Sequence, residues 1–71
     1  MRLEDQIGML VALEKVRGGR FRGLSPFAKE VTPSFYVDVN RQEWHDFASG
    51  RSGKSMGDFV RQLAEAKGAS A

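Results

Sequence analysis

Basic side chains gather in one part of this 71-residue chain, between residues 15 and 29, with no acidic residue among them. The whole chain carries a net charge of only +2. A local cationic segment on a weakly basic domain is typical of proteins that bind a phosphate backbone. A solvated basic face without a ligand is the alternative that composition leaves open. The cations of the segment are Lys15, Arg17, Arg20, Arg22 and Lys29.

Aromatic side chains are numerous for so short a chain, with five Phe, one Trp and one Tyr. Core packing is the expected role for most of them, since large aromatic rings are mostly buried. Tyr36 and Trp44 are the two exceptions that we expect, because an exposed ring on a sheet can stack on an unpaired base. The rings expected in the core are Phe21, Phe27, Phe35, Phe47 and Phe59, with Trp44 as the alternative sixth.

The glycine-rich segment 48–55 reads Ala-Ser-Gly-Arg-Ser-Gly-Lys-Ser and fits the relaxed phosphate-binding pattern of nucleotide hydrolases. Such enzymes also need a parallel sheet and a magnesium-binding aspartate on a later strand. Only sixteen residues follow Ser55, so we expect no nucleotide hydrolysis. Backbone donors at a helix start beside Arg51 and Lys54 nevertheless favour an anion, and we expect a DNA phosphate there.

Other catalytic chemistry has little basis in the sequence. His45 is the only histidine, and the chain has no cysteine, which excludes disulfides and thiolate metal sites. The carboxylates show no spacing suited to acid–base catalysis. We therefore expect a protein that is not an enzyme and has no cofactor.

The first half of the chain predicts a helix followed by a hairpin. Apolar residues at helical spacing favour a short helix within residues 3–13, although Gly8 weakens it. Residues 12–16 fit either an extension of that helix or a strand. Gly18-Gly19 indicates a reversal into a strand over residues 20–24, and an irregular loop is expected between the prolines of 26–33.

The second half predicts a second hairpin and a closing helix. Residues 34–39 alternate, which places Tyr36 on one face of a half-buried strand and Phe35 on the other. A reversal at 40–41 leads to a strand over 42–47, with Trp44 and Phe47 on opposite faces. Residues 48–54 are expected to form a loop. Ser55 and Asp58 form a capping pattern for a helix that ends near Gly68, with an apolar face of Met56, Phe59, Val60 and Leu63.

Residues 24–37, Leu-Ser-Pro-Phe-Ala-Lys-Glu-Val-Thr-Pro-Ser-Phe-Tyr-Val, resemble the zinc-binding domain of DnaG-type bacterial primases. That family reads Cys-Pro-Phe-His followed by Thr-Pro-Ser-Phe. Residues 44–50, Trp-His-Asp-Phe-Ala-Ser-Gly, stand where the family has Tyr-His-Cys-Phe-Gly-Cys-Gly, and residues 57–60 resemble its closing helix. The similarity covers residues 21–60.

The resemblance places the four metal-ligand positions at Ser25, Ala28, Asp46 and Ser49, and none of these can replace a zinc thiolate. Serine is a poor zinc donor, alanine has no donor atom, and one carboxylate does not make a tetrahedral site. A metal-free form of the domain is therefore expected. We expect apolar packing of the aromatic rings to hold the two loops together in place of zinc.

These observations predict one α+β domain over residues 1–71, with an antiparallel sheet of three to five strands, zinc-ribbon-like but without zinc, and a helix at each end.

The resemblance implies a non-catalytic module that binds single-stranded template DNA for a primase or primase-like replication system. The alternative is a protein-interaction module docking on a replication or mobile-element polymerase or helicase. A primase, polymerase or helicase on the same or another chain is the expected protein partner. The expected location is the cytoplasm, without membrane contact. The residues expected to bind nucleic acid are Arg20, Arg22, Lys29, Arg51 and Lys54 for phosphates, and Tyr36 or Trp44 for stacking.

Overall fold

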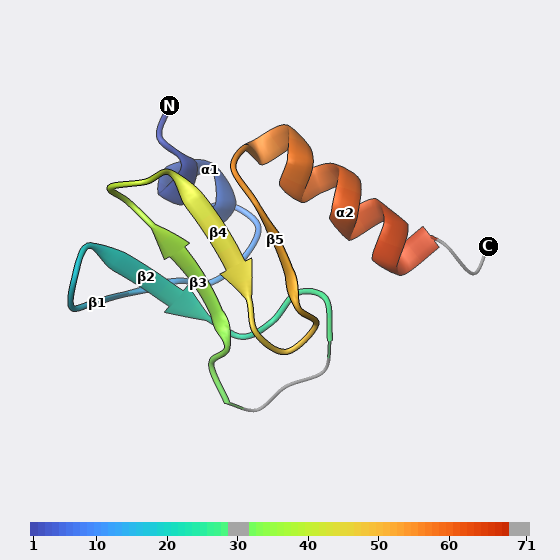
Figure 1. The fold of residues 1–71 in the computed structure, drawn as a ribbon, viewed down its shortest axis with the longest axis horizontal. Coiled ribbons are helices and arrows are strands. Elements are labelled where there is room, and N and C mark those ends of the chain that lie inside the picture. Colours follow the sequence, from blue (N-terminus) through green and yellow to red (C-terminus); the bar gives the residue numbers. More distant parts are fainter. Residues whose placement is uncertain (29–31, 69–71) are drawn as a thin grey trace.

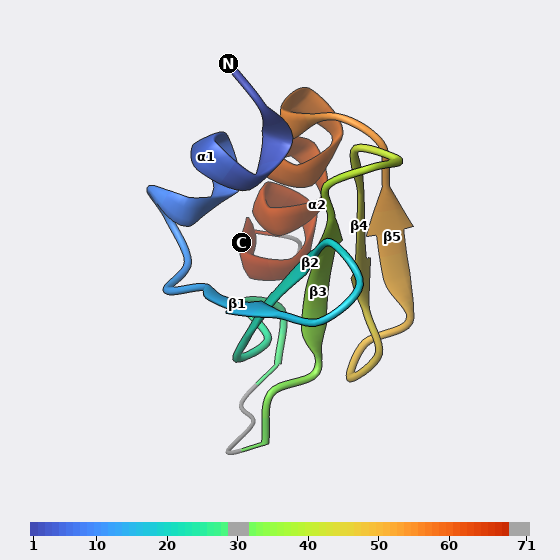
Figure 2. The ribbon, with the colours of Figure 1, turned by 90° about the vertical axis from the view of Figure 1, so that its left-hand side faces the viewer.

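A computed structural model describes residues 1–28 and 32–68, which form one five-stranded sheet with two helices on one of its faces (Figures 1 and 2). All neighbouring strands are antiparallel and follow the chain order β1-β2-β3-β4-β5. Within these residues no helix is long and apolar enough to cross a membrane. The elements are α1 (Leu3–Gly8), β1 (Glu14–Val16), β2 (Arg20–Gly23), β3 (Phe35–Asp38), β4 (Glu43–Asp46), β5 (Arg51–Gly53) and α2 (Met56–Gly68).

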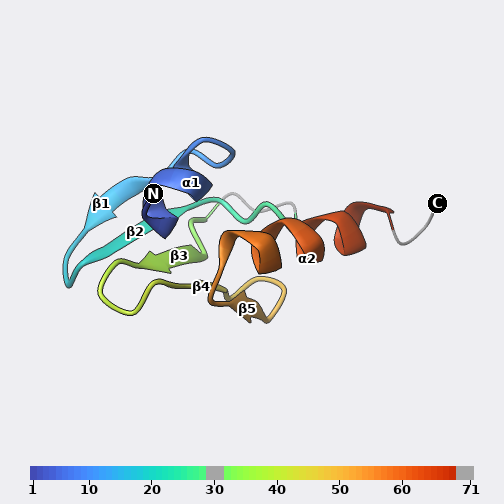
Figure 3. The same cartoon turned by 90° about the horizontal axis from the view of Figure 1, so that it is seen from above.

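The core lies between the two central strands and the helices. Phe35, Val37 and Trp44 are fully buried on the inner face of β3 and β4. Leu3 and Ile7 cover them from α1, and Phe59 covers them from α2. Since side chains alternate along a strand, burial of these residues leaves the intervening side chains on the opposite, outer face. Figure 2 shows both helices on one side of the sheet, and Figure 3 shows the same arrangement from above.

Both hairpins form where the glycines and the alternation predicted them. The first turn contains Gly18 and Gly19, both with positive φ, and the second turn occupies residues 39–42. The choice that the sequence left open for residues 12–16 is settled, because residues 14–16 are strand β1. The first helix ends at Gly8, five residues short of the predicted limit, because the chain must turn to reach β1.

The prediction of a loop over residues 48–54 is wrong in its second half. Arg51, Ser52 and Gly53 form β5, which pairs with β4 across Asp46, His45 and Trp44. The Arg-Ser-Gly sequence of β5 has weak strand propensity. Its pairing is therefore determined by β4 and not by the local sequence.

The second helix begins as predicted, because the Asp58 N–H donates to Ser55 Oγ at 3.0 Å. Phe59 is buried, and Met56 and Leu63 pack against the core. Val60 is 46% exposed, so its assignment to the buried face is wrong. The helix turns only Met56, Phe59 and Leu63 toward the core, and Val60 lies outside this stripe.

A set of hydrogen bonds fastens α1 to the turn between β3 and β4. The side chain of Gln42, whose φ is 54°, accepts the Leu3 N–H at 2.8 Å and donates to Glu4 and to the Val39 carbonyl. Arg2 donates to both Glu4 and the same carbonyl. Burial acts to raise the pKa of Glu4, but the hydrogen bonds from Gln42 and Arg2 outweigh it and hold the pKa below its ordinary value.

Gly53→Ala is expected to destabilise the domain by about 1–3 kcal/mol, the usual cost of overpacking. A Cβ at this position would clash with the Asp58 carboxylate and lie 2.9 Å from the Trp44 ring. Gly8→Ala is the matched control, because nothing lies within 4 Å of its Cβ, and we expect stability to be unchanged or slightly raised. Urea unfolding of both variants measures the difference. Equal stabilities would contradict close packing of β5 on Trp44.

Candidate nucleic-acid interface

Three of the four positions that the resemblance assigns to metal ligands are joined by hydrogen bonds around one buried carboxylate. Asp46 is 1% exposed. Its Oδ2 accepts the Ser25 hydroxyl at 2.8 Å, the Ser49 hydroxyl at 2.5 Å and the Ser49 N–H at 3.2 Å. Ser25 Oγ in turn accepts the N–H groups of Phe27 and Ala28, each at 3.1 Å. We call Ser25, Asp46 and Ser49 the carboxylate bridge.

The carboxylate bridge does not fit a structural zinc ion. Zinc sites of this kind need four ligands, mostly thiolate or imidazole, in a tetrahedron. Here Ala28 offers only a backbone N–H, and both serine hydroxyls donate to Asp46. Among the described residues no group of three His, Cys, Asp or Glu side chains could hold a metal ion. The bridge therefore joins the two loops without metal. The expectation that apolar packing alone replaces zinc is incomplete, because these polar contacts link the same loops.

Three rings gather on the outer face of β3 and β4, at the end of the sheet nearest the carboxylate bridge. Tyr36 and His45 are direct partners across the two strands. Phe47 follows β4 and is 72% exposed. Its ring centroid lies 5.6 Å from that of Tyr36 in an edge-on arrangement, and 6.4 Å from His45 with the planes nearly parallel. Large exposed rings on a sheet provide stacking surfaces for bases.

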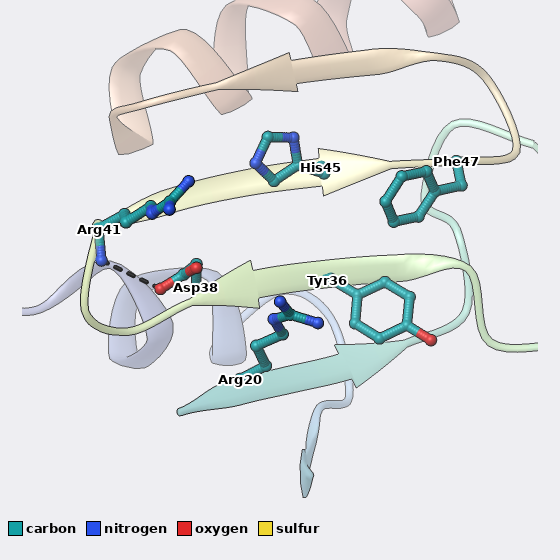
Figure 4. A pocket seen from close by; sticks show the side chains of 6 residues that line it. All are labelled: Arg20, Tyr36, Asp38, Arg41, His45 and Phe47. Carbon is teal, nitrogen blue, oxygen red and sulfur yellow. Dashed lines mark hydrogen bonds between the residues drawn. The ribbon is translucent and has the colours of Figure 1, made fainter. Parts of the chain in front are cut away.

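Basic side chains flank these rings and complete a shallow concavity of about 570 Å³ (Figure 4). Arg20 and Arg22 project from β2 on the same outer face, since they pair with Asp38 and Tyr36 of β3. Arg41 joins them from the β3–β4 turn. The lining consists of Arg20, Tyr36, Asp38, Arg41, His45 and Phe47, which we call the outer-face concavity.

Acidic side chains lower the positive charge of this face. Arg22 Nε donates to Glu14 at 2.8 Å, and hydrogen bonds with Glu14 and then Tyr36 raise the pKa of Arg22. Glu43 lies 3.7 Å from both His45 Nε2 and Lys54 Nζ. Exposed ion pairs of this kind contribute little to stability and are screened by salt. The face is therefore mixed in charge, with Arg20 and Arg41 outside the ion pairs of the described residues.

The structure brings together some of the sequence-predicted site residues and separates others. Arg20, Arg22 and Tyr36 share the outer face, and Lys54 lies beside Glu43 at its margin. Lys29 lies outside the described residues. The assignment of Trp44 as a stacking ring is wrong, because it is fully buried and packs on Phe27 and Phe59.

Arg51 does not join the predicted phosphate site. It pairs with Asp46 in register and therefore faces the helices, where its guanidinium lies 5.6 Å from the Phe27 ring centroid and 3.7 Å from Glu65. The expected anion site beside Arg51 and Lys54 is thus reduced to Lys54.

Four of the six lining residues were missed by the sequence reasoning, namely Asp38, Arg41, His45 and Phe47. Phe47 was assigned to the core, although its spacing of three from Trp44 already placed it on the opposite face. The register between β3 and β4 sets His45 beside Tyr36, and a turn residue such as Arg41 carries no periodic signal.

Comparisons with known proteins identify the family of the chain. The family model described as CHC2 zinc finger, Zn_ribbon_DnaG, matches residues 1–70. A DNA primase of Deinococcus radiodurans is 38% identical over 73 residues, covering 87% of this chain and 13% of the relative. DNA primases of Mycolicibacterium smegmatis and Listeria monocytogenes are 40% and 45% identical, covering 75% and 69% of this chain. The chain spans 8–13% of the length of these three relatives.

Ser25→Ala is expected to lower the free energy of unfolding by about 1–3 kcal/mol. The change removes a donor to Asp46 and leaves the N–H groups of Phe27 and Ala28 without their acceptor. Ser52→Ala is the control, because this exposed serine lies on β5 outside the bridge, and an effect within about 0.5 kcal/mol is expected. Thermal and urea unfolding measure both. A Ser25→Ala variant as stable as the control would exclude the bridge as a structural link.

Restoring the family's ligand types at the four positions is expected to create a zinc site. Ser25→Cys, Ala28→His, Asp46→Cys and Ser49→Cys would place four donors around the point where the bridge now converges. We expect one zinc per chain by elemental analysis and a higher melting temperature with zinc than with chelator. A version that retains Ala28 is the control and should bind zinc more weakly. Substoichiometric zinc in the folded fourfold variant would contradict convergence of the positions.

Proposed function

This chain belongs to the CHC2 zinc finger family, and on that basis we propose that it is a non-catalytic module that binds single-stranded template DNA in a primase or primase-like replication system. The polymerising activity would reside in another domain or chain, since this chain corresponds to a small part of the primases it matches. A primase, polymerase or helicase is the protein partner that this role requires, and the cytoplasm is the proposed location.

The observation that carries the proposal is the outer face of the sheet. Phe47 is largely exposed and lies against Tyr36 and His45 instead of in the core. Large apolar rings left on the surface of a small domain generally indicate a binding site. Arg20 and Arg41 line the same concavity as these rings. Rings beside cations match the two groups of an unpaired nucleotide, its base and its phosphate.

A single strand fits this face better than a duplex. The bases of a duplex are stacked on one another and their faces are inaccessible, whereas an unpaired base can lie on an exposed ring. The face also lacks a protruding helix that could enter the major groove, because α1 and α2 both cover the opposite side (Figure 2). We infer that bases contact Tyr36 and Phe47.

The charges of the face favour modest, salt-dependent affinity. Arg20, Arg22 and Lys54 would contact phosphates, but Asp38 and Glu43 on the same face repel them. Backbone binding weakens as salt rises because counterions are released on binding.

Phe47→Ala is expected to weaken binding of a labelled 12-nucleotide single strand by about 5- to 100-fold, the effect of losing one stacked base. Val60→Ala is the matched control, because this exposed apolar residue lies on α2 away from the outer face, and we expect no change. Fluorescence anisotropy at low salt measures both affinities. Equal affinities of the two variants would remove Phe47 from the interface.

Arg20→Ala is expected to reduce the dependence of log affinity on log salt by about 0.7, the contribution of one phosphate contact to a single strand. Lys67→Ala, in the last turn of α2, removes the same charge elsewhere and should leave the slope nearly unchanged. The same titrations at several salt concentrations give both slopes. If the unmodified chain bound no single strand at low salt, the role in template binding would fail and a protein-interaction module would replace it.

A further inference from the structure

Asp38 is an unexpected residue for a site that binds a polyanion. It lies half-buried in the outer-face concavity and pairs in register with Arg20 on one side and Glu43 on the other. One of its oxygens, Oδ1, accepts the Arg41 N–H at 3.0 Å, which fixes the carboxylate at the start of the turn. Among the described residues no cation forms an ion pair with it.

A carboxylate in this position repels phosphate, so what it can offer a bound strand beyond its contact with the turn is the acceptance of hydrogen bonds. The donors of a single strand are the N–H groups of its bases. The concavity of about 570 Å³ lies within the range of ligand pockets, about 300–1,000 Å³. It has rings of Tyr36 and Phe47 at one end and Asp38 at the other, as Figure 4 shows. A base stacked on a ring can thus present its edge toward Asp38.

We propose that the outer-face concavity takes a guanine base, with Asp38 accepting hydrogen bonds from the base and an arginine donating to it. Guanine presents two neighbouring N–H donors, N1–H and the 2-amino group, which match the two oxygens of a carboxylate. Its O6 and N7 atoms accept hydrogen bonds, and an arginine side chain is well suited to donate to them. Arg20 and Arg41 both line the concavity and are the available donors.

The other bases fit this arrangement less well. Adenine and cytosine each offer one amino group beside a ring nitrogen acceptor, which would face the second carboxylate oxygen unfavourably. Thymine offers one N–H between two carbonyl groups, and both carbonyls would meet the carboxylate. Guanine alone combines paired donors with a separate pair of acceptors, so Asp38 and the arginines can both be satisfied.

This inference rests on the proposed function where it takes the ligand to be a base of the template strand. A free guanine nucleotide would present the same groups to the concavity. The test therefore uses two ligand types with the intact chain. The first is a series of 12-nucleotide strands of thymine in which one central base is thymine, guanine, adenine, cytosine or hypoxanthine. The second is free deoxyguanosine monophosphate, with thymidine monophosphate as its control, followed through the NMR signals of the Tyr36 and Phe47 rings.

We expect the strand with guanine to bind about tenfold more tightly than the all-thymine strand, the discrimination typical of one bidentate contact. Hypoxanthine, which lacks the 2-amino group, should give an intermediate affinity. Asp38→Asn keeps an acceptor for the Arg41 N–H but should abolish the preference while all-thymine binding is retained or increased. Asp5→Asn, an equal change of charge on an exposed residue of α1, should leave the preference intact.

The outcomes separate the guanine site from template binding. Equal affinity for all bases, or a preference that survives Asp38→Asn, would overturn the guanine site and leave template binding standing.

If no strand binds, template binding fails. The mononucleotide titration then decides the guanine site: shifts with the guanine nucleotide that Asp38→Asn removes would support it, and their absence would overturn it. Displacement of the strand by free nucleotide at similar concentration would identify the nucleotide as the source, and failure to displace it would identify the template.

Discussion

The fold depends on a single buried carboxylate that gathers hydrogen bonds from two loops. Asp46 lies at the end of β4, and its Oδ2 accepts both serine hydroxyls of the carboxylate bridge. A buried charge is costly unless it is hydrogen-bonded, and the three donors to Oδ2 supply part of that compensation, while Oδ1 is buried without a partner among the described residues. Because Ser25 also caps the N–H groups of the loop that carries Phe27, the bridge places that ring on Trp44 at a centroid distance of 5.5 Å. Metal coordination has been exchanged for polar contacts at the same corner of the fold.

The two faces of the sheet follow from this arrangement. Once Trp44 and Phe35 are packed beneath the helices, against Phe59 of α2, strand alternation leaves Tyr36 and His45 outside. The rings on the inner face of the sheet pack in the core and stabilise the domain, and the rings on the outer face are accessible to a ligand. The same alternation assigns Arg20 to the outer face and Arg51 to the inner face, so two similar cations have different roles.

Much of the fold could be predicted from the sequence, because alternation, glycine pairs and a capping serine act locally. The hairpin at Gly18-Gly19, the half-buried β3 and the start of α2 at Ser55 all have such local causes. β5 could not be predicted, since its Arg-Ser-Gly sequence forms a strand only through its pairing with β4. The site was predicted in part. Tyr36 and Arg20 lie on the outer face, as predicted. Trp44 was predicted to stack on a base and Phe47 to lie in the core, and the structure shows the reverse burial. The sequence shows that these two residues occupy opposite faces of the strand but not which face the helices cover.

The carboxylate bridge also changes what the domain requires from its surroundings. A ribbon held by thiolates and zinc folds only where the metal is supplied and the sulfur atoms stay reduced, since ligand oxidation or chelation removes the metal. The hydroxyl and carboxylate groups of the bridge are not oxidised as thiolates are, and no bound metal is needed to hold them together. The chain contains no cysteine. The contacts that join the two loops of this chain therefore require neither a supply of zinc nor reduced sulfur atoms.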